Sequence, residues 1–233
     1  MGIRNPFLYL NFMDRHILKE SKTHAPKEVL YLQSTGCKWG NCEFCGYKDD
    51  VSSDPYIVNG PVIKEVTGIY GTLDVVVSGS FTELDPKSLK KLKSVIKQKN
   101  IQELHIDLHY MYRSQIPEIR SFFAPCQLKI RCMVGSFLAT KRLLLKKGLS
   151  ATATAKEIAK DFQGANLFCC FNGDSQESIL IDISEGLQNF EYLSIKVAHD
   201  QSGFLHRDEV LAQWFIHELY PTLKKNPRIT IEL

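Results

Sequence analysis

Several features that would assign a function at once are absent from this 233-residue sequence. It contains no apolar run long enough to span a membrane, and its formal net charge of +3 is too small to favour a nucleic acid or a membrane surface as a partner. The phosphate loop GxxxxGK[ST], a GxGxxG at the first strand–helix turn and the serine elbow GxSxG are missing as well. These absences exclude the common nucleotide hydrolases, Rossmann enzymes and serine esterases.

The sequence also lacks the marks of an exported protein. Residues 1–6 do not place a basic segment before an apolar one, so no secretory signal is expected. The seven cysteines are an odd number, which argues for reduced thiols in the cytoplasm rather than for a disulfide framework. Hydrophobic residues make up 44% of the chain and charged residues 24%, as in an ordinary globular protein. We expect one domain over residues 1–233.

Short apolar segments alternate with amphipathic ones along the chain. The former predict strands and the latter predict helices, and their alternation indicates a parallel sheet with helical crossovers. The expected fold class is therefore α/β, a single-domain partial (β/α)6 barrel of the TIM-like kind, with a flavodoxin-like sheet as the alternative. Residues 1–26 form a lead-in, an edge strand or a cap, in which residues 14–22 could be helical.

The predicted strands are 29–33, 74–77, 104–108, 128–133, 167–171, 192–197 and a short final strand at 228–231. The predicted helices are 61–70, 85–96, 116–123, 136–145, 153–162, 176–187 and 208–223. Asp85 followed by Pro86 is a typical helix start, and Ser136 and Gly148 are expected to begin and close the fourth of these helices.

The most distinctive segment follows the first predicted strand. Cys37, Cys42 and Cys45 have four and then two residues between them, and glycines on each side let the backbone curl so that three thiolates can meet at one centre. Thiolates are soft ligands that suit iron–sulfur clusters or zinc. Three cysteines would leave one iron of a cluster open to an external ligand. The alternative is a structural zinc site with His24 or a later histidine as the fourth ligand.

With Phe44 directly before the last cysteine, this loop resembles that of the radical S-adenosylmethionine (SAM) enzymes. The resemblance implies that Cys37, Cys42 and Cys45, in a loop over 35–55, hold a [4Fe–4S] cluster. It also implies that SAM occupies the fourth iron, next to Phe44, and is cleaved to a 5′-deoxyadenosyl radical. The first spacing is four residues here, whereas three is commonest in that family.

Polar residues at the carboxyl ends of the strands are the candidate site, because active sites of parallel α/β folds lie there. Ser78, Gly79 and Ser80 look like the glycine-containing motif that receives the SAM amino group in the family. The family's frequent Gly-Gly-Glu reads Gly-Ser-Phe here, although Glu83 is close by. Position suggests four further SAM contacts: Arg131 for the carboxylate, Ser136 for a ribose hydroxyl, and Val197 and His199 for the adenine.

The third strand carries the candidates for substrate binding. Alternation places His105, Asp107 and His109 on one face, where a carboxylate could accept a bidentate hydrogen bond from an amidine or guanine edge. The alternative for Asp107 is a salt bridge with Arg131. The full set of substrate-binding or catalytic candidates is Asp107, His109, Tyr112, Arg113, Asn172 and Asp174. For the loop at 172–175, a helix cap by Asp174 or Ser175 is the alternative.

Several other polar or reactive residues are expected to be structural. Cys126, Cys132, Cys169 and Cys170 are predicted to line the core as small apolar residues. Lys141 and Arg142 are predicted to lie on an exposed helix face.

The compact chain favours a small-molecule substrate over a protein or tRNA. Together with the variant loop, it resembles the queuine lyases of bacterial queuosine salvage. That resemblance implies radical cleavage of the N-glycosidic bond of queuosine 5′-phosphate to release queuine, with Asp107 at the deazaguanine edge and Arg113 at the 5′-phosphate. The alternatives are a 7-carboxy-7-deazaguanine synthase-like radical SAM enzyme and a zinc-stabilised, non-catalytic interaction module. A reductase or flavodoxin would supply the electron, and neither a membrane nor a directly bound nucleic acid is expected as a partner.

Overall fold

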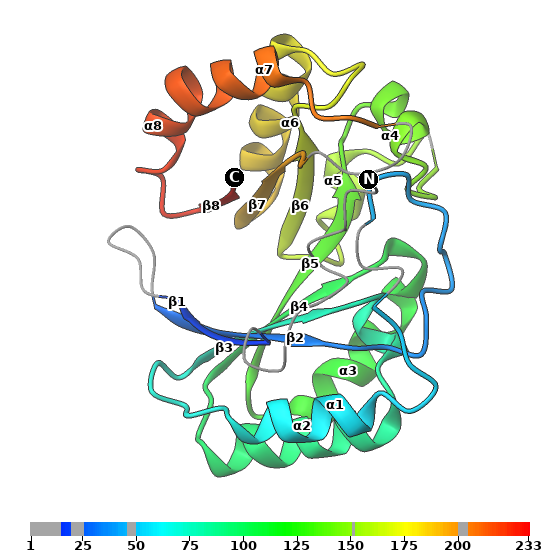
Figure 1. Cartoon of the computed structure of the whole chain (residues 1–233), viewed down its shortest axis with the longest axis vertical. Helices are drawn as coiled ribbons and strands as arrows, with labels where there is room; N and C mark the ends of the chain where they lie inside the picture. Colours follow the sequence, from blue (N-terminus) through cyan, green and yellow to red (C-terminus); the bar gives the residue numbers. More distant parts are fainter. Residues whose placement is uncertain (1–14, 20–25, 46–49, 151, 200–204) are drawn as a thin grey trace, which may run out of the picture. The chain divides into compact units, whose positions relative to one another are not determined.

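The computed structural model describes residues 15–19, 26–45, 50–150, 152–199 and 205–233 (Figure 1). Most of the lead-in and the zinc candidate His24 therefore lie outside the described residues. The chain divides into two compact units. Unit 1 lies within Met1–Gly40, Gly46–Leu108 and Tyr112–Ile130, and unit 2 within Asn41–Cys45, His109–Met111 and Arg131–Leu233.

Unit 1 is a small sheet covered by helices. Its strands are β1 (His16–Lys19), β2 (Lys27–Leu32), β3 (Thr72–Val77) and β4 (Glu103–Leu108), and its helices are α1 (Tyr56–Lys64), α2 (Pro86–Gln98), α3 (Ile116–Phe123) and the 3-10 turn η3 (Phe81–Glu83). Strand β1 is antiparallel to β2, and β2, β3 and β4 are parallel. Figure 1 shows α1, α2 and α3 along the same face of these strands.

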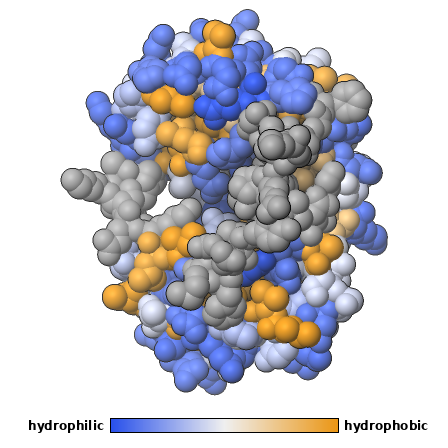
Figure 2. Space-filling model, in the orientation of Figure 1, coloured by the Kyte–Doolittle hydropathy of each residue, from blue (hydrophilic) through white to orange (hydrophobic). Residues whose placement is uncertain are grey.

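Helix α2 illustrates how the local sequence produces these elements. The Asp85 side chain accepts hydrogen bonds from two amides of the first turn, at 3.0 and 2.9 Å, and Pro86 has no amide hydrogen that would need a partner there. Leu92, Val95 and Ile96 are buried on one face of the helix. Lysines occupy the opposite face, and the surface over α2 is hydrophilic (Figure 2).

Unit 2 continues the same alternation. Strand β5 (Gln127–Gly135) begins in unit 1 and ends in unit 2, and it is followed by β6 (Gly164–Cys169), β7 (Tyr192–Val197) and β8 (Ile229–Glu232). The helices are α4 (Ala139–Leu145), α5 (Ala155–Ile158), α6 (Gln176–Asn189), α7 (Glu209–Trp214), the π-helical η5 (Phe215–Leu219) and α8 (Tyr220–Leu223). The 3-10 segment η4 (Tyr110–Gln115) begins in unit 2 and ends in unit 1. Within unit 2, the described pairs of strands from β5 to β8 are parallel.

The eight strands follow one another in chain order from β1 to β8. Parallel strands in chain order, with helices between them, are the topology of a partial (β/α) barrel, which confirms the predicted fold class. A flavodoxin-like sheet has the order 2-1-3-4-5 and is excluded. The described part of the lead-in contains an edge strand, as expected.

Two predictions for unit 1 are wrong. Residues 16–19 form β1 rather than a helix, because pairing with β2 satisfies the backbone groups on that edge. The helix predicted over 61–70 is α1, which begins at Tyr56 and ends at Lys64. Gly68 has a positive φ of 77°, and the Glu28 carboxylate accepts hydrogen bonds from the amides of Thr67 and Gly68 at 2.8 and 2.6 Å. These contacts hold the segment after α1 in a turn.

Helix boundaries in unit 2 also differ from the predictions. Helix α4 begins after Leu138 rather than at Ser136, and it closes at Lys146, which has a left-handed φ of 50°, rather than at Gly148. The helix predicted over 153–162 is only the single turn α5. The long helix predicted over 208–223 is interrupted by the π-helical η5.

Candidate active site

Cys37 lies in the loop that follows β2, in a turn made by glycines. Gly36 and Gly40 have positive φ angles of 139° and 59°, a conformation that few other residues adopt without strain. The Gly40 amide donates a hydrogen bond to Cys37 Sγ at 3.4 Å. A hydrogen bond to the charged form of an acid favours that form, so this contact prepares Cys37 to act as a thiolate ligand.

The second half of the loop is anchored by an aromatic ring. The Cys45 amide donates to the Cys42 carbonyl at 3.4 Å. Cys42 is buried and Cys45 is half-buried. Phe44 stacks on Phe168 of β6 with ring centroids 4.2 Å apart and packs against the buried cluster that includes Phe171. The segment from Cys42 to Cys45 is therefore fixed to the core of unit 2 through the Phe44 ring.

The donor chemistry of the loop fits an iron–sulfur cluster. Three free thiols, one of them with an amide hydrogen bond to its sulfur, are the ligands that such clusters use. Within the described ranges, no three His, Cys, Asp or Glu side chains are already gathered around one metal position. Of the other cysteines, Cys132, Cys169 and Cys170 are buried as predicted, whereas Cys126 is only half-buried.

The turn after β3 has a glycine at its centre, packed closely against the Glu83 carboxylate. The Ser78 hydroxyl accepts a hydrogen bond from the Ser34 amide at 2.8 Å. A Cβ atom on Gly79 would lie 2.5 Å from Glu83 Oε2 and 3.1 Å from Ser34 Oγ. Such contacts are closer than van der Waals separation, so a side chain at position 79 would displace the Glu83 carboxylate from its place beside the turn.

The Glu83 carboxylate joins this turn to the cysteine loop. It accepts hydrogen bonds from the Ser80 amide at 2.6 Å, from the Lys38 amide at 2.7 Å and from the Tyr112 hydroxyl at 2.7 Å. Burial and the hydrogen bond to Glu83 raise the pKa of Tyr112 well above its usual value. The phenol therefore keeps its proton at neutral pH and donates it to the carboxylate.

The residues predicted on and after β4 have different environments. His105 pairs with Glu103 at 2.6 Å, and this hydrogen bond lowers the pKa of Glu103. Asp107 lies on the same partly exposed face of the strand. Arg113 is exposed in η4. His109 is buried: its Nε2 donates to the Lys147 carbonyl at 2.8 Å and its Nδ1 accepts from an amide at 3.3 Å.

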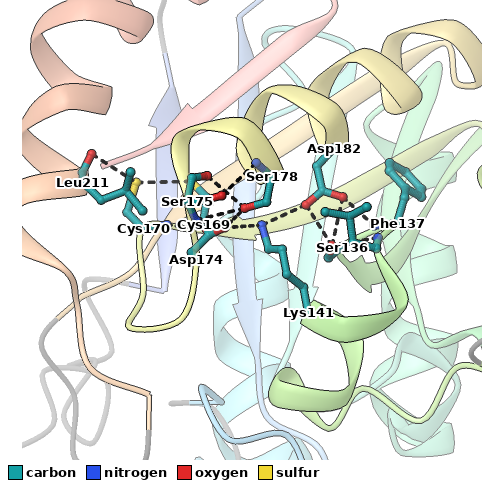
Figure 3. Close-up of polar contacts among 11 residues, drawn as sticks. Ser136, Phe137, Lys141, Cys169, Cys170, Asp174, Ser175, Ser178, Asp182 and Leu211 are labelled. Carbon is teal, nitrogen blue, oxygen red and sulfur yellow. Dashed lines mark hydrogen bonds and ion pairs between the residues drawn. The ribbon is translucent and has the colours of Figure 1, made fainter.

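A buried ionic network fixes the turn after β5 (Figure 3). The Ser136 hydroxyl donates to the Asp182 carboxylate of α6 at 2.8 Å and accepts from the Leu138 amide at 3.0 Å. The Lys141 ammonium lies 2.9 Å from Asp182 and 2.8 Å from Asp174. Burial opposes its charged form, but the two carboxylates outweigh this effect and raise the pKa of Lys141. Lys141 is therefore a buried ion-pair partner, and its predicted exposure is wrong.

Arg142 is the second residue for which the predicted exposure is wrong. It is only 4% exposed, and its Nη1 donates to the Ala153 carbonyl at 2.8 Å. Helix α4 therefore buries two successive cationic residues against other parts of unit 2.

The turn after β6 is held by the same network. The Asp174 carboxylate accepts hydrogen bonds from the amides of Cys170 and Ser175 at 3.0 and 2.9 Å, and also from the Ser178 hydroxyl. The helix cap itself is Ser175, whose hydroxyl accepts from the Ser178 amide at 3.1 Å. Asn172 accepts from the His206 amide at 2.7 Å. Both candidates on this turn thus hold its backbone.

The three remaining candidates are on β5 and at the end of β7. Arg131 is 5% exposed and Val197 is fully buried. His199 is partly exposed, and burial, together with Lys196 and Arg207, lowers its pKa. His199 is therefore neutral near pH 7.

Comparison with known proteins identifies the family. No helix in the described segments is long and apolar enough to cross a membrane. No protein-family model and no curated protein matches the chain. Among solved structures, it is similar to queuine lyase from Clostridium spiroforme bound to SAM and queuine, with 30% identity, coverage of 94% of each chain and a TM-score of 0.85. The chain belongs to the queuine lyase family of radical SAM enzymes.

Membership of the queuine lyase family confirms the resemblance that the cysteine loop carries. It also makes the chain an enzyme, and the alternative of a non-catalytic, zinc-stabilised module is set aside.

Sequence reasoning did not predict the contacts of several residues described above, although it noted Glu83 as an acidic residue close to Gly79. Glu83 had a detectable signal, because Ser80 and Glu83 form the S-x-x-E pattern of a capping box. Lys141 and Asp182 had none, since they meet across 41 positions of the chain.

Proposed function

We propose that this radical SAM enzyme cleaves the N-glycosidic bond of queuosine 5′-phosphate and releases queuine. The observation that carries the proposal is the similarity, over 94% of both chains, to a queuine lyase bound to SAM and queuine. The loop with three cysteines adds chemical support, because three thiolates leave one iron of a [4Fe–4S] cluster open for SAM.

Cys37, Cys42 and Cys45 would hold the cluster. When bound, the cluster and SAM supply a 5′-deoxyadenosyl radical that takes a hydrogen atom from the substrate. The chain's own residues then have to hold SAM, orient the substrate and keep water away. A reductase or flavodoxin would provide the electron, and the free thiols of this chain fit a cytoplasmic location.

The turn after β3 would receive the amino group of SAM. Gly79 keeps the backbone of this turn accessible. The described partners of the Glu83 carboxylate are all neutral donors, so its negative charge is available to an ammonium group. Tyr112 would position Glu83 by donating to it.

Two residues of unit 2 would contact the rest of SAM. Arg131 would bind the carboxylate, and the partly exposed His199 would contact the adenine. Val197 and Ser136 are fully buried, so they would support the site from behind, with the Ser136 proton donated to Asp182.

Two residues of unit 1 would orient the substrate. Asp107 would accept hydrogen bonds from the deazaguanine edge, and the exposed Arg113 would bind the 5′-phosphate through two parallel hydrogen bonds. His109, Asn172 and Asp174 already bind backbone groups of the protein. They would therefore hold the walls of the site rather than touch the substrate.

A product assay tests this proposal. Anaerobically reconstituted enzyme is incubated with SAM, dithionite and queuosine 5′-phosphate, and queuine and 5′-deoxyadenosine are measured by mass spectrometry. Both products are expected from the wild type. C42A is expected to form neither above background, whereas C126A, which loses a thiol outside the loop, is expected to form both.

Two outcomes would contradict the proposal in different ways. If 5′-deoxyadenosine forms without queuine, the radical chemistry stands but the substrate is wrong, and formation of 7-carboxy-7-deazaguanine from a pterin would then identify the alternative enzyme. If neither product forms and the wild type binds no iron, the cluster assignment is wrong.

A further inference from the structure

The end of α4 and the two residues after it support the second half of the cysteine loop. The Glu43 amide donates to the Leu145 carbonyl at 3.4 Å, and the Glu43 carboxylate pairs with Lys146. The Lys147 ammonium lies over the Phe44 ring, 4.9 Å from its centroid. Three consecutive residues therefore contact the two residues that separate the second and third cysteines.

Lys147 is fixed in this place by its backbone and its neighbours. The left-handed conformation of Lys146 ends α4 and reverses the chain. The Lys147 carbonyl accepts the hydrogen bond from His109 at 2.8 Å. A Cβ atom on Gly135 would lie 3.3 Å from Lys147 Cγ, so the glycine provides the space that the lysine stem occupies.

The charge of Lys147 has no anionic partner among the described residues. Lys147 is 5% exposed, and the described contact of its ammonium is the Phe44 ring. Lys141, equally buried in the same unit, pairs with two carboxylates instead. A buried charge without a counter-charge is unfavourable. The missing negative charge is therefore expected from something that binds beside Phe44.

We propose that Lys147 is an outer-sphere cation of the iron–sulfur cluster and that its ammonium raises the reduction potential of the cluster. The inference rests on the proposed cluster at Cys37, Cys42 and Cys45, two of which flank Phe44. A [4Fe–4S] cluster with three thiolates is anionic, and its reduction adds one electron and no proton. A nearby buried cation stabilises the more negative, reduced form more than the oxidised form.

A redox titration of SAM-free enzyme, with dithionite as the reductant and the electron paramagnetic resonance (EPR) signal as the readout, tests this role. In K147M and K147Q, the ratio of reduced to oxidised cluster at a given solution potential is expected to fall about tenfold, a shift of about 59 mV for one electron. K147R keeps the charge and is expected to stay within about twofold of the wild type, well under 59 mV.

K156Q is the matched control. It removes the charge of an exposed lysine on α5 of the same unit, where water and salt screen it. The reduction potential of this variant is expected to equal that of the wild type. If Lys147 only supported the loop by packing, the positive charge of K147R would not keep its reduction potential closer to that of the wild type than the potential of K147Q.

Each of the remaining outcomes either supports or overturns the inference. If K147M and K147Q hold four irons at the wild-type potential, Lys147 has no such role, although the proposed function stands. Lys147 likewise has no role in setting the potential if these variants weaken SAM binding and leave the potential unchanged. If the neutral variants bind no iron while K147R does, the charge is required and the inference is supported. If K147R also fails to bind iron, packing is the cause and the inference is wrong. A wild type without iron would overturn both proposals.

Discussion

Each unit contains a carboxylate that accepts several hydrogen bonds, but the two carboxylates differ in whether a cation is among their described partners. In unit 1, Glu83 accepts from two amides and from the hydroxyl of Tyr112. In unit 2, Asp182 accepts from Ser136 and from the ammonium of Lys141, which also binds a second carboxylate. In unit 2, the Lys141 ammonium lies between the two carboxylates and holds two turns together. The charge of Glu83 has no cation among its described partners, which suits a residue that meets a cationic ligand.

The largest effect is expected from breaking the network of unit 2. D182A should lower the free energy of unfolding by about 3 kcal/mol or more, because Lys141 then loses one of its buried counter-charges. Urea unfolding of wild type and variant measures it. D182N should lose less than D182A, since its amide oxygen can still accept hydrogen bonds from the Ser136 hydroxyl and the Phe137 amide. A change within about 0.5 kcal/mol for D182A would show that the network does not stabilise the fold.

Substitution of Glu83 should weaken SAM binding and should lower the free energy of unfolding less than substitution of Asp182 does. In E83Q the SAM dissociation constant should rise at least about tenfold, or about 1.4 kcal/mol, because the charge that faces the ammonium of SAM is lost. The free energy of unfolding should change less than in D182A. Calorimetric titration of the cluster-loaded enzyme measures the affinity. E118Q, which neutralises an exposed glutamate on α3, is the matched control. Equal affinities for E83Q and E118Q would remove Glu83 from the SAM site.

Tyr112 should have a smaller effect of the same kind. Y112F removes one of the three donors to Glu83 but leaves the carboxylate charged. We expect the SAM dissociation constant to rise roughly threefold, or ~0.7 kcal/mol, through looser positioning of Glu83. The E83Q/Y112F double variant should bind SAM no more weakly than E83Q, because Tyr112 acts through Glu83. Additive losses in that double variant would mean that Tyr112 contacts SAM by itself.

The smallest effect concerns acid stability in unit 1. Burial opposes the charged form of Glu28, but hydrogen bonds from Thr67, His16 and Gly68 outweigh it and lower its pKa below the usual 4.5. Stability from this group is therefore present above pH 4.5 and is lost as pH falls through the lower native pKa. Urea unfolding at pH 7 and pH 3 should show a smaller acid-induced loss in E28Q than in the wild type. An equal loss would mean that Glu28 does not contribute.

Local signals in the sequence predicted the elements of the fold well. The β-branched run at 74–77 lies in β3, and the Asp85 cap begins α2 where expected. Boundaries failed where distant residues decide the local structure. The turn at Gly68 depends on Glu28 from another strand, and the start of α4 depends on Asp182 binding Ser136.

The candidate site was predictable only in part, for the same reason. The three cysteines carry their chemistry in their spacing, so the loop could be found from sequence. The environments of Lys141 and Lys147 could not, because burial of a lysine depends on which distant side chains or bound groups balance its charge. Glu83 lies between these cases, since its capping pattern is local but its contact with the amide of Lys38 spans 45 positions.

The central claim is that the loop with three cysteines holds a four-iron cluster with one iron open to SAM. The most direct test is the EPR spectrum of anaerobically reconstituted, dithionite-reduced enzyme before and after SAM is added, together with metal analysis. The account predicts four irons for each chain and a signal that changes when SAM binds. A colourless protein with one zinc, or a four-iron signal that SAM leaves unchanged, would contradict it.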